Sequence, residues 1–294
     1  NPSAHLYLNG QTVHVSRLHL RAAHFHADGA TVHVGIWREG YDCQIYGNLM
    51  MYAEAGVLSG NTFHGDLTII NNPCSPCPNF EWPMGGFMFS YARPDRFKGE
   101  VNFSNIGPGG YMTVGVFAHP DPIIFEKKAN FSMTSAGRPT INLSGRASNT
   151  VIFEDTVSFT LNVPDRFSYV YVRGSTFFKK PVYVTTIGCN FATGVTAGEV
   201  SPPPTGIVEF EDDLYLNLKE VGIITLGASA EVATLFKSSA NIRWFGDKYK
   251  AGNIHFSNVT FEPSEVPIEI YVQPDSLPTF NKSYVHLWGG RTYH

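Results

Sequence analysis

Charged residues are scarce in this sequence, and so are long apolar runs. Asp, Glu, Lys and Arg make up 16% of the 294 residues, and 21 Lys and Arg against 25 Asp and Glu give a net charge of −4. Because 43% of the chain is hydrophobic, so small a net charge excludes an intrinsically disordered protein. No apolar run approaches the ~18–20 residues of a membrane-spanning helix. Ala, Glu, Lys, Leu and Arg do not dominate, which argues against a coiled coil or helical bundle.

The residues that are abundant favour strands joined by turns. The chain holds 22 Phe, 14 Tyr, 28 Gly and 19 Pro. Aromatic residues are enriched in β-strands, and Gly and Pro punctuate turns. The composition therefore predicts an all-β protein.

A short pattern recurs along the chain and sets the expected architecture. It consists of an aromatic residue, two usually polar residues, and an apolar residue six positions after the first, as in Phe153-Glu-Asp-Thr-Val-Ser-Phe159. Looser copies begin at Phe103 and Phe256. The six full copies begin at Phe63, Phe125, Phe153, Phe178, Phe210 and Phe236.

The spacing of these copies is typical of stacked coils. From Phe125 to Phe236 the intervals are 28, 25, 32 and 26 residues, close to the ~20–30 residues of a β-solenoid coil. We therefore predict a single-chain β-solenoid, or parallel β-helix, with irregular coils and capped ends, in which the leading Phe residues form a ladder inside the stack. The alternative is an antiparallel β-sandwich or barrel.

The repeat also suggests how the chain is organised. We expect a capping or irregular β section at 1–60, coils at 61–262 and a closing section at 263–294, because the end coils of a solenoid must be covered. Strands run into a Pro-Asp turn four times, and Pro followed by Asp suits a type I turn. These turns begin at Pro94, Pro120, Pro164 and Pro274. The sequence opens Asn1-Pro2-Ser3 without Met, so we expect a processed mature chain or a piece of a longer one. We also expect the protein to be part of a larger surface assembly.

The four cysteines suggest a disulfide more than a metal or redox site. Cys74-Ser-Pro-Cys77 lies among Asn and Pro residues that predict a loop, with no helix following as thioredoxin-type chemistry requires. Cys43 lies about one coil away, so it can pair with Cys74 or Cys77, and a short Cys74–Cys77 bridge is the other option. Cys189 is several coils from Cys43 and is expected to be a buried thiol. A disulfide would place the protein outside a reducing cytosol.

Histidines gather near the start of the chain. Six of the 11 fall in the first 33 residues, and His24 and His26 share one face of an expected strand. Two imidazoles can hold a metal only if a third ligand converges, and Asp28 is the nearest acid in sequence. Half-exposed strand histidines, or a surface that responds to pH near 6, are the simpler interpretations. We therefore predict no cofactor and no metal, with His24 and His26 as the candidates if there is one.

In its repeat texture the chain resembles the right-handed parallel β-helix, or pectin-lyase-like, superfamily of adhesins, tailspikes and polysaccharide-degrading enzymes. The resemblance implies a possible lyase or hydrolase activity. Of the hydrolase motifs only the pair Asp212-Asp213 is present, inside a turn where other copies carry Lys-Lys or Asp-Thr. A solvated turn explains this pair better than acid–base catalysis does. No nucleophile elbow, phosphate-binding loop or His-Glu-x-x-His motif occurs, so the sequence leans away from an enzyme.

We therefore expect a recognition or adhesion module, extracellular or displayed on a cell surface, that binds a glycan, a protein or a surface. A polysaccharide-degrading enzyme and a nucleic-acid-binding solenoid of a pilus tip are the alternatives, although the acidic net charge opposes phosphate binding. The candidate contact residues are Phe80, Trp82, Lys127, Lys128, Lys179 and Lys180. Phe87 and Phe89, close to the Cys74–Cys77 loop, are expected to be strand core.

Overall fold

The computed structural model describes most of the chain as strands. The described residues are 4–72, 86–107, 110–117, 119–134, 140–144, 149–162, 168–194, 206–219, 223–229, 231–246, 253–262 and 279–287. No helix occurs among them, and hence none of a length and hydropathy that would cross a membrane. The prediction of an all-β protein is confirmed.

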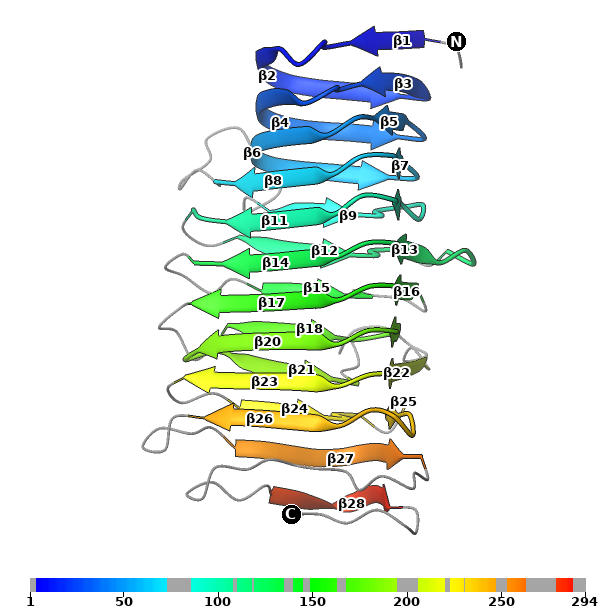
Figure 1. Cartoon of the computed structure of the whole chain (residues 1–294), viewed down its shortest axis with the longest axis vertical. Coiled ribbons are helices and arrows are strands. Elements are labelled where there is room, and N and C mark those ends of the chain that lie inside the picture. The colour runs from blue at the N-terminus through cyan, green and yellow to red at the C-terminus, as the bar shows by residue number, and fades with distance from the viewer. Residues whose placement is uncertain are drawn as a thin grey trace.

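Every strand pairing in the described part of the chain is parallel, and through the middle of the chain each strand pairs with the strand three places further along. The chain therefore winds through three successive strands and returns one layer further on, so that the coils stack along one axis, with strands β1 and β28 at opposite ends (Figure 1). Strands at the same position in successive coils lie side by side, and they form three faces.

Face 1 is formed by the first strand of each coil. Its strands are β1 (Ala4–Tyr7), β3 (Ala23–His26), β5 (Gln44–Tyr46), β7 (Thr62–Phe63), β10 (Arg96–Phe97), β13 (Ile123–Phe125), β16 (Thr150–Phe153), β19 (Ser175–Phe178), β22 (Gly206–Phe210) and β25 (Val232–Phe236). Face 2 follows it around the corner. Its strands are β8 (Leu67–Asn71), β11 (Val101–Asn105), β14 (Ala129–Met133), β17 (Val157–Asn162), β20 (Val182–Ile187), β23 (Leu214–Lys219) and β26 (Ile242–Gly246).

Face 3 closes each coil. Its strands are β9 (Phe87–Phe89), β12 (Tyr111–Val114), β15 (Thr140–Leu143), β18 (Tyr169–Val172), β21 (Asn190–Thr193) and β24 (Ile223–Leu226). Near the two ends of the chain, single long strands cover two faces. These are β2 (Thr12–Arg21), β4 (Ala30–Tyr41) and β6 (Leu49–Ser59), together with β27 (Asn253–Phe261), which pairs with β28 (Thr279–Leu287). Strand β6 pairs with both β8 and β9, so the coils continue without a break across residue 60.

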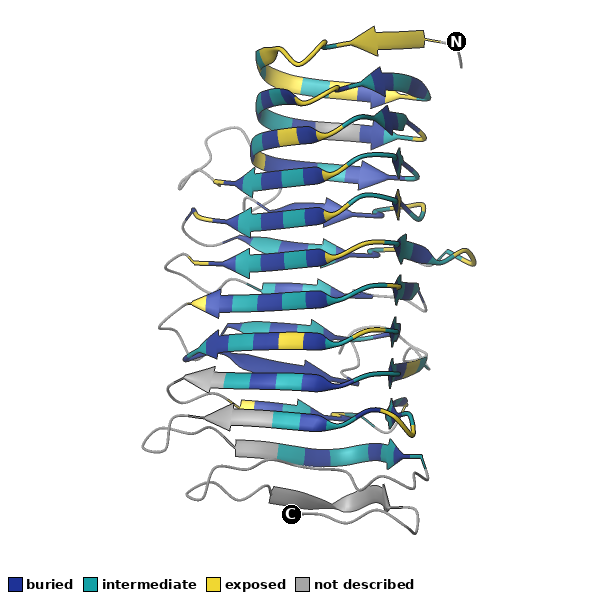
Figure 2. Cartoon of the chain, viewed as in Figure 1, coloured by how far each residue is buried: buried dark blue, intermediate teal, exposed yellow. Residues whose placement is uncertain are grey.

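Alternation of side chains builds the core. Along most described strands buried residues alternate with half-buried or exposed ones (Figure 2), because successive strand side chains point to opposite sides. The parallel register then places equivalent inward residues on top of each other. The predicted ladder is present on face 1: all six leading Phe residues are buried and stack in one column.

The column is longer than the sequence pattern predicted. Phe97 stacks between Phe63 at 5.1 Å and Phe125 at 4.5 Å, and Phe261 stacks on Phe236 at 4.9 Å between ring centroids. Phe103 belongs to face 2, paired with Phe131 in the next coil. Phe87 and Phe89 are fully buried on face 3, as expected.

The Pro-Asp turns do not share one structural role. Asp95 is fully buried and accepts hydrogen bonds from the amide and side chain of Asn61 and from the amide and hydroxyl of Ser90. Asp121 follows the second of these prolines and has a side chain 74% exposed. Asp95 therefore links two coils at the corner between faces 3 and 1. The turns at Pro164 and Pro274 lie outside the described residues.

Candidate functional site

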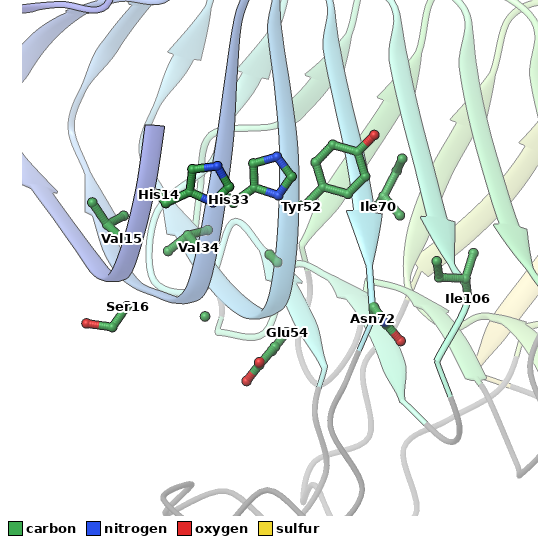
Figure 3. A pocket seen from close by; sticks show the side chains of 12 residues that line it. His14, Val15, Ser16, His33, Val34, Tyr52, Glu54, Ile70, Asn72 and Ile106 are labelled. Atoms are coloured by element: carbon green, nitrogen blue, oxygen red, sulfur yellow. The ribbon is translucent and has the colours of Figure 1, made fainter. Parts of the chain in front are cut away.

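A groove of about 550 Å³ lies where β2, β4 and β6 bend from face 2 towards face 3 (Figure 3). The bend passes through Ser16, Gly35 and Glu54 in successive coils. Gly35 is required there, because a Cβ atom would lie 2.8 Å from the carbonyl oxygen of Ser16. The three strands can therefore turn closely together, and the side chains that precede the bend line one wall of the groove.

That wall is a column of three aromatic rings. His14, His33 and Tyr52 are register partners in β2, β4 and β6. Their ring centroids are 4.3 Å and 4.6 Å apart, with interplanar angles of 8° and 4°. The rings therefore cover each other's faces, and what they present to a ligand is mainly their nitrogen and hydroxyl edges, repeated at the spacing of the coils.

The rest of the groove mixes polar and apolar groups. Exposed Glu54 and Asn72 supply a carboxylate and an amide, and Ile70 and Ile106 supply apolar surface, with Ile106 51% exposed. Glu54 is the only acid among the described residues that line it. A lone carboxylate lacks the partner that two-carboxylate glycoside hydrolysis needs. The described lining therefore combines hydrogen-bonding groups with apolar surface.

The sequence carried a signal for this wall that the Phe pattern did not reveal. Residues Thr12–Val15 and Thr31–Val34 are the same tetrapeptide, Thr-Val-His-Val, repeated after 19 residues. The preceding segments also match, since Ala-His begins at both Ala4 and Ala23. A search for a period near 19 would have placed His14 on His33, and the period differs from that of the later coils because these coils carry shorter connections.

A second column of rings lies on the exterior of face 1. It runs through Tyr7, His26, Tyr46 and His64, with neighbouring centroids 4.3–4.9 Å apart. His5 and His24 stack beside it at 4.6 Å. Burial and nearby Lys98, whose Nζ is 3.5 Å from Nδ1 of His64, lower the pKa of His64.

The predicted metal candidates belong to this second column. His26 Nε2 is 3.1 Å from Nδ1 of His5, and His24 Nδ1 is 3.3 Å from the hydroxyl of Tyr46. Among the described residues no group of three His, Cys, Asp or Glu side chains is placed to hold a metal ion. The histidines are therefore occupied by ring stacking and by each other.

The lysine candidates lie at the corner between faces 1 and 2. Lys127, Lys128 and Lys180 are exposed, and Nζ of Lys179 is 3.8 Å from a carboxylate oxygen of Glu154. Backbone bonds from Glu126, Glu154 and Lys179 to ladder residues of the preceding coils place these three in one row. Acids therefore interrupt the basic residues, as the sequence indicated. Phe80 and Trp82 lie outside the described residues, so their role stays a prediction.

Asp212 and Asp213 make hydrogen bonds that hold neighbouring parts of the stack together. Asp213 is 8% exposed, and its carboxylate accepts hydrogen bonds from the amide and side chain of Asn241 and from Arg243 Nε at 2.7 Å. Asp212 accepts a hydrogen bond from the amide of Asp213. Asp213 thus joins two coils through a neutralising Arg243.

The predicted disulfide of Cys43 is wrong. Cys43 is a buried thiol whose Sγ lies 3.2 Å from the carbonyl oxygen of Tyr41, and burial raises its pKa. Its side chain is fully buried within the hydrophobic core of the stack. Cys189 is a buried thiol 3.3 Å from the carbonyl oxygen of Ile187, as expected. Cys74 and Cys77 lie outside the described residues.

The state of Cys43 can be tested by alkylation. Because the thiolate is the reactive form and burial disfavours it, we expect iodoacetamide at pH 8 to leave Cys43 unmodified in the folded protein. Peptide mass mapping after a short exposure measures this, with the protein unfolded in guanidinium as the positive control. Rapid modification of Cys43 in the folded state would contradict its burial.

The chain matches no protein-family model, no curated protein and no solved structure.

Proposed function

We propose that this protein is a recognition module that binds an extended polysaccharide in the groove of the N-terminal coils. The observation that carries the proposal is the column of His14, His33 and Tyr52, whose polar edges repeat at the coil spacing along one wall. A glycan chain offers hydroxyl groups at a comparable interval. The apolar surface of Ile70 and Ile106 suits the non-polar faces of sugar rings, as in ligand sites where a few polar groups fix orientation.

The proposal also includes the type of fold and the location of the protein. Three strands per coil and parallel pairing throughout the described residues support a β-solenoid of the parallel β-helix kind, and such a rigid stack suits display outside the cell or on its surface. With Cys43 a thiol, the disulfide argument for an extracellular location loses that cysteine. The location is therefore proposed from the rigid stack and the ligand class.

Substitution of Tyr52 tests the groove. Tyr52→Ala removes the last ring of the wall, and we expect binding to the best ligand of a broad glycan array to weaken at least tenfold. The matched control is Tyr183→Ala, which removes an exposed tyrosine stacked on Tyr215 at 4.7 Å on the same face. Affinity is measured by calorimetry at pH 7.5, with circular dichroism to verify the fold. Equal losses in both variants would place the binding site elsewhere.

Enzymatic cleavage is the second candidate and has a distinct outcome. If Glu54 were a catalytic acid, incubation with the bound polysaccharide would release shorter chains, and Glu54→Gln would abolish their release without weakening binding. We expect no shortening, because the lining residues within the described part of the chain hold no second carboxylate. Size-exclusion chromatography of the polysaccharide measures this directly.

A further inference from the structure

The N-terminal coils carry most of the histidine of the protein. Seven of its 11 histidines lie in the first 66 residues, and six of them stack on other rings along two neighbouring faces. The stacked ones are His5, His14, His24, His26, His33 and His64, and the seventh is His19. Histidine is the side chain whose charge ordinarily changes between pH 5 and 8. Acidification therefore adds positive charge at this end of the stack, in a protein that is otherwise acidic.

Two of these histidines, His14 and His33, line the groove, so acidification changes the charge of the groove itself. Its titratable lining groups are His14, His33, Tyr52 and Glu54, and exposed Arg17 follows the bend directly. With neutral imidazoles, Glu54 gives the described lining of the groove a net charge of −1. With both imidazoles protonated, the net charge of the same lining is +1.

Protonation of both imidazoles places two positive charges close together. Their centroids are 4.3 Å apart, and like charges at that distance repel each other even in water. A bound anion relieves the repulsion, because it contacts both ring edges at once. Binding of an anion and uptake of protons therefore favour each other, as linkage requires.

We propose that protonation of His14 and His33 converts the groove into a site for an acidic polysaccharide, one that carries carboxylate or sulfate groups. This inference rests on the proposed function and adds its ligand class and its regulation by pH. The concave wall favours a chain that lies along the stack over a flat membrane surface. The neutral groups of Tyr52 and Asn72 remain available for hydroxyl groups between the acidic ones.

The experiment compares dextran sulfate with unmodified dextran at pH 5.5 and pH 7.5 by calorimetry. We expect dextran sulfate to bind at least tenfold more tightly at pH 5.5 than at pH 7.5, and dextran to show no such change. The double variant His14→Gln/His33→Gln should lose the pH effect. The matched control His5→Gln/His24→Gln, which alters an equally close pair on face 1, should keep it.

The outcomes separate the two proposals. Binding of dextran sulfate that is independent of pH, or a pH effect that survives in His14→Gln/His33→Gln, overturns the inference while Tyr52→Ala still tests the groove. Equally tight, His14- and His33-dependent binding of duplex DNA at pH 5.5 overturns the polysaccharide class. A lack of binding to every glycan at both pH values overturns the inference together with the proposed function.

Discussion

Phe153→Ala is expected to lower the free energy of unfolding by about 3–5 kcal/mol. Phe153 is fully buried and stacks between Phe125 at 4.7 Å and Phe178 at 5.3 Å. Removing the ring loses both stacked contacts and leaves a cavity, because coils held by backbone pairing on either side cannot collapse into the space. Guanidinium denaturation followed by tryptophan fluorescence measures the loss.

The control is a ring pair on the outside of the stack. Tyr183 stacks on Tyr215 at 4.7 Å but is 42% exposed, so Tyr183→Ala should cost no more than about 1.5 kcal/mol. An equal effect of the two variants would show that the Phe column is not the buried core of the protein.

Asp95→Ala should be similarly damaging. The carboxylate is buried and accepts hydrogen bonds from two donors of Asn61 and two of Ser90. Deleting it leaves buried donors without acceptors, at about 1–3 kcal/mol each. We expect a loss of at least about 3 kcal/mol, measured by the same denaturation. A loss below about 1 kcal/mol would contradict the role of Asp95 in joining the coils.

Asp95 also predicts a dependence of stability on pH. Burial raises its pKa from 3.8 to about 6, so between these values the folded protein binds a proton that the unfolded chain has released. The stability contribution is fully present below pH 3.8 and is lost as the pH rises through about 6. The shift of about two pH units corresponds to ~3 kcal/mol.

Asp95→Asn isolates this effect, because Asn cannot titrate. Relative to the variant, the wild-type protein should lose about 2.4 kcal/mol of stability between pH 4 and pH 7, most of the full shift. Taking the difference cancels the histidines, which titrate in both proteins. A constant difference over this pH range would show that the carboxyl titrates alike in the folded and unfolded states.

The sequence predicted the core column because its pattern is local. An aromatic residue, a polar corner and an apolar residue six positions on describe one turn of the coil, and parallel register then aligns the copies. Phe97-Lys-Gly-Glu-Val-Asn-Phe103 also fits the pattern. The copy in this coil therefore begins at Phe97, one strand before the looser copy expected at Phe103.

The Phe pattern does not predict the groove, although the Thr-Val-His-Val repeat carries the alignment of its two histidines. The groove depends on His14 lying on His33, which requires the register of β2 against β4, and on the close approach of Gly35 to Ser16. Neither follows from the residues of one coil. The Pro-Asp turns show the same limit, since identical dipeptides give a buried Asp95 and an exposed Asp121. Position within the stack decides between them.

The stacking of the coils is tested most directly by a distance along the axis. Thr12 and Tyr183 lie seven register steps apart on one outer column, so at about 4.8 Å per step they should be ~34 Å apart. Nitroxide labels carried on ketone-bearing amino acids avoid the native cysteines and allow pulsed electron resonance to measure this. Labels at Thr31 and Tyr183 should give about 5 Å less. Distances near 20 Å, or no difference between the pairs, would contradict a stack of coils.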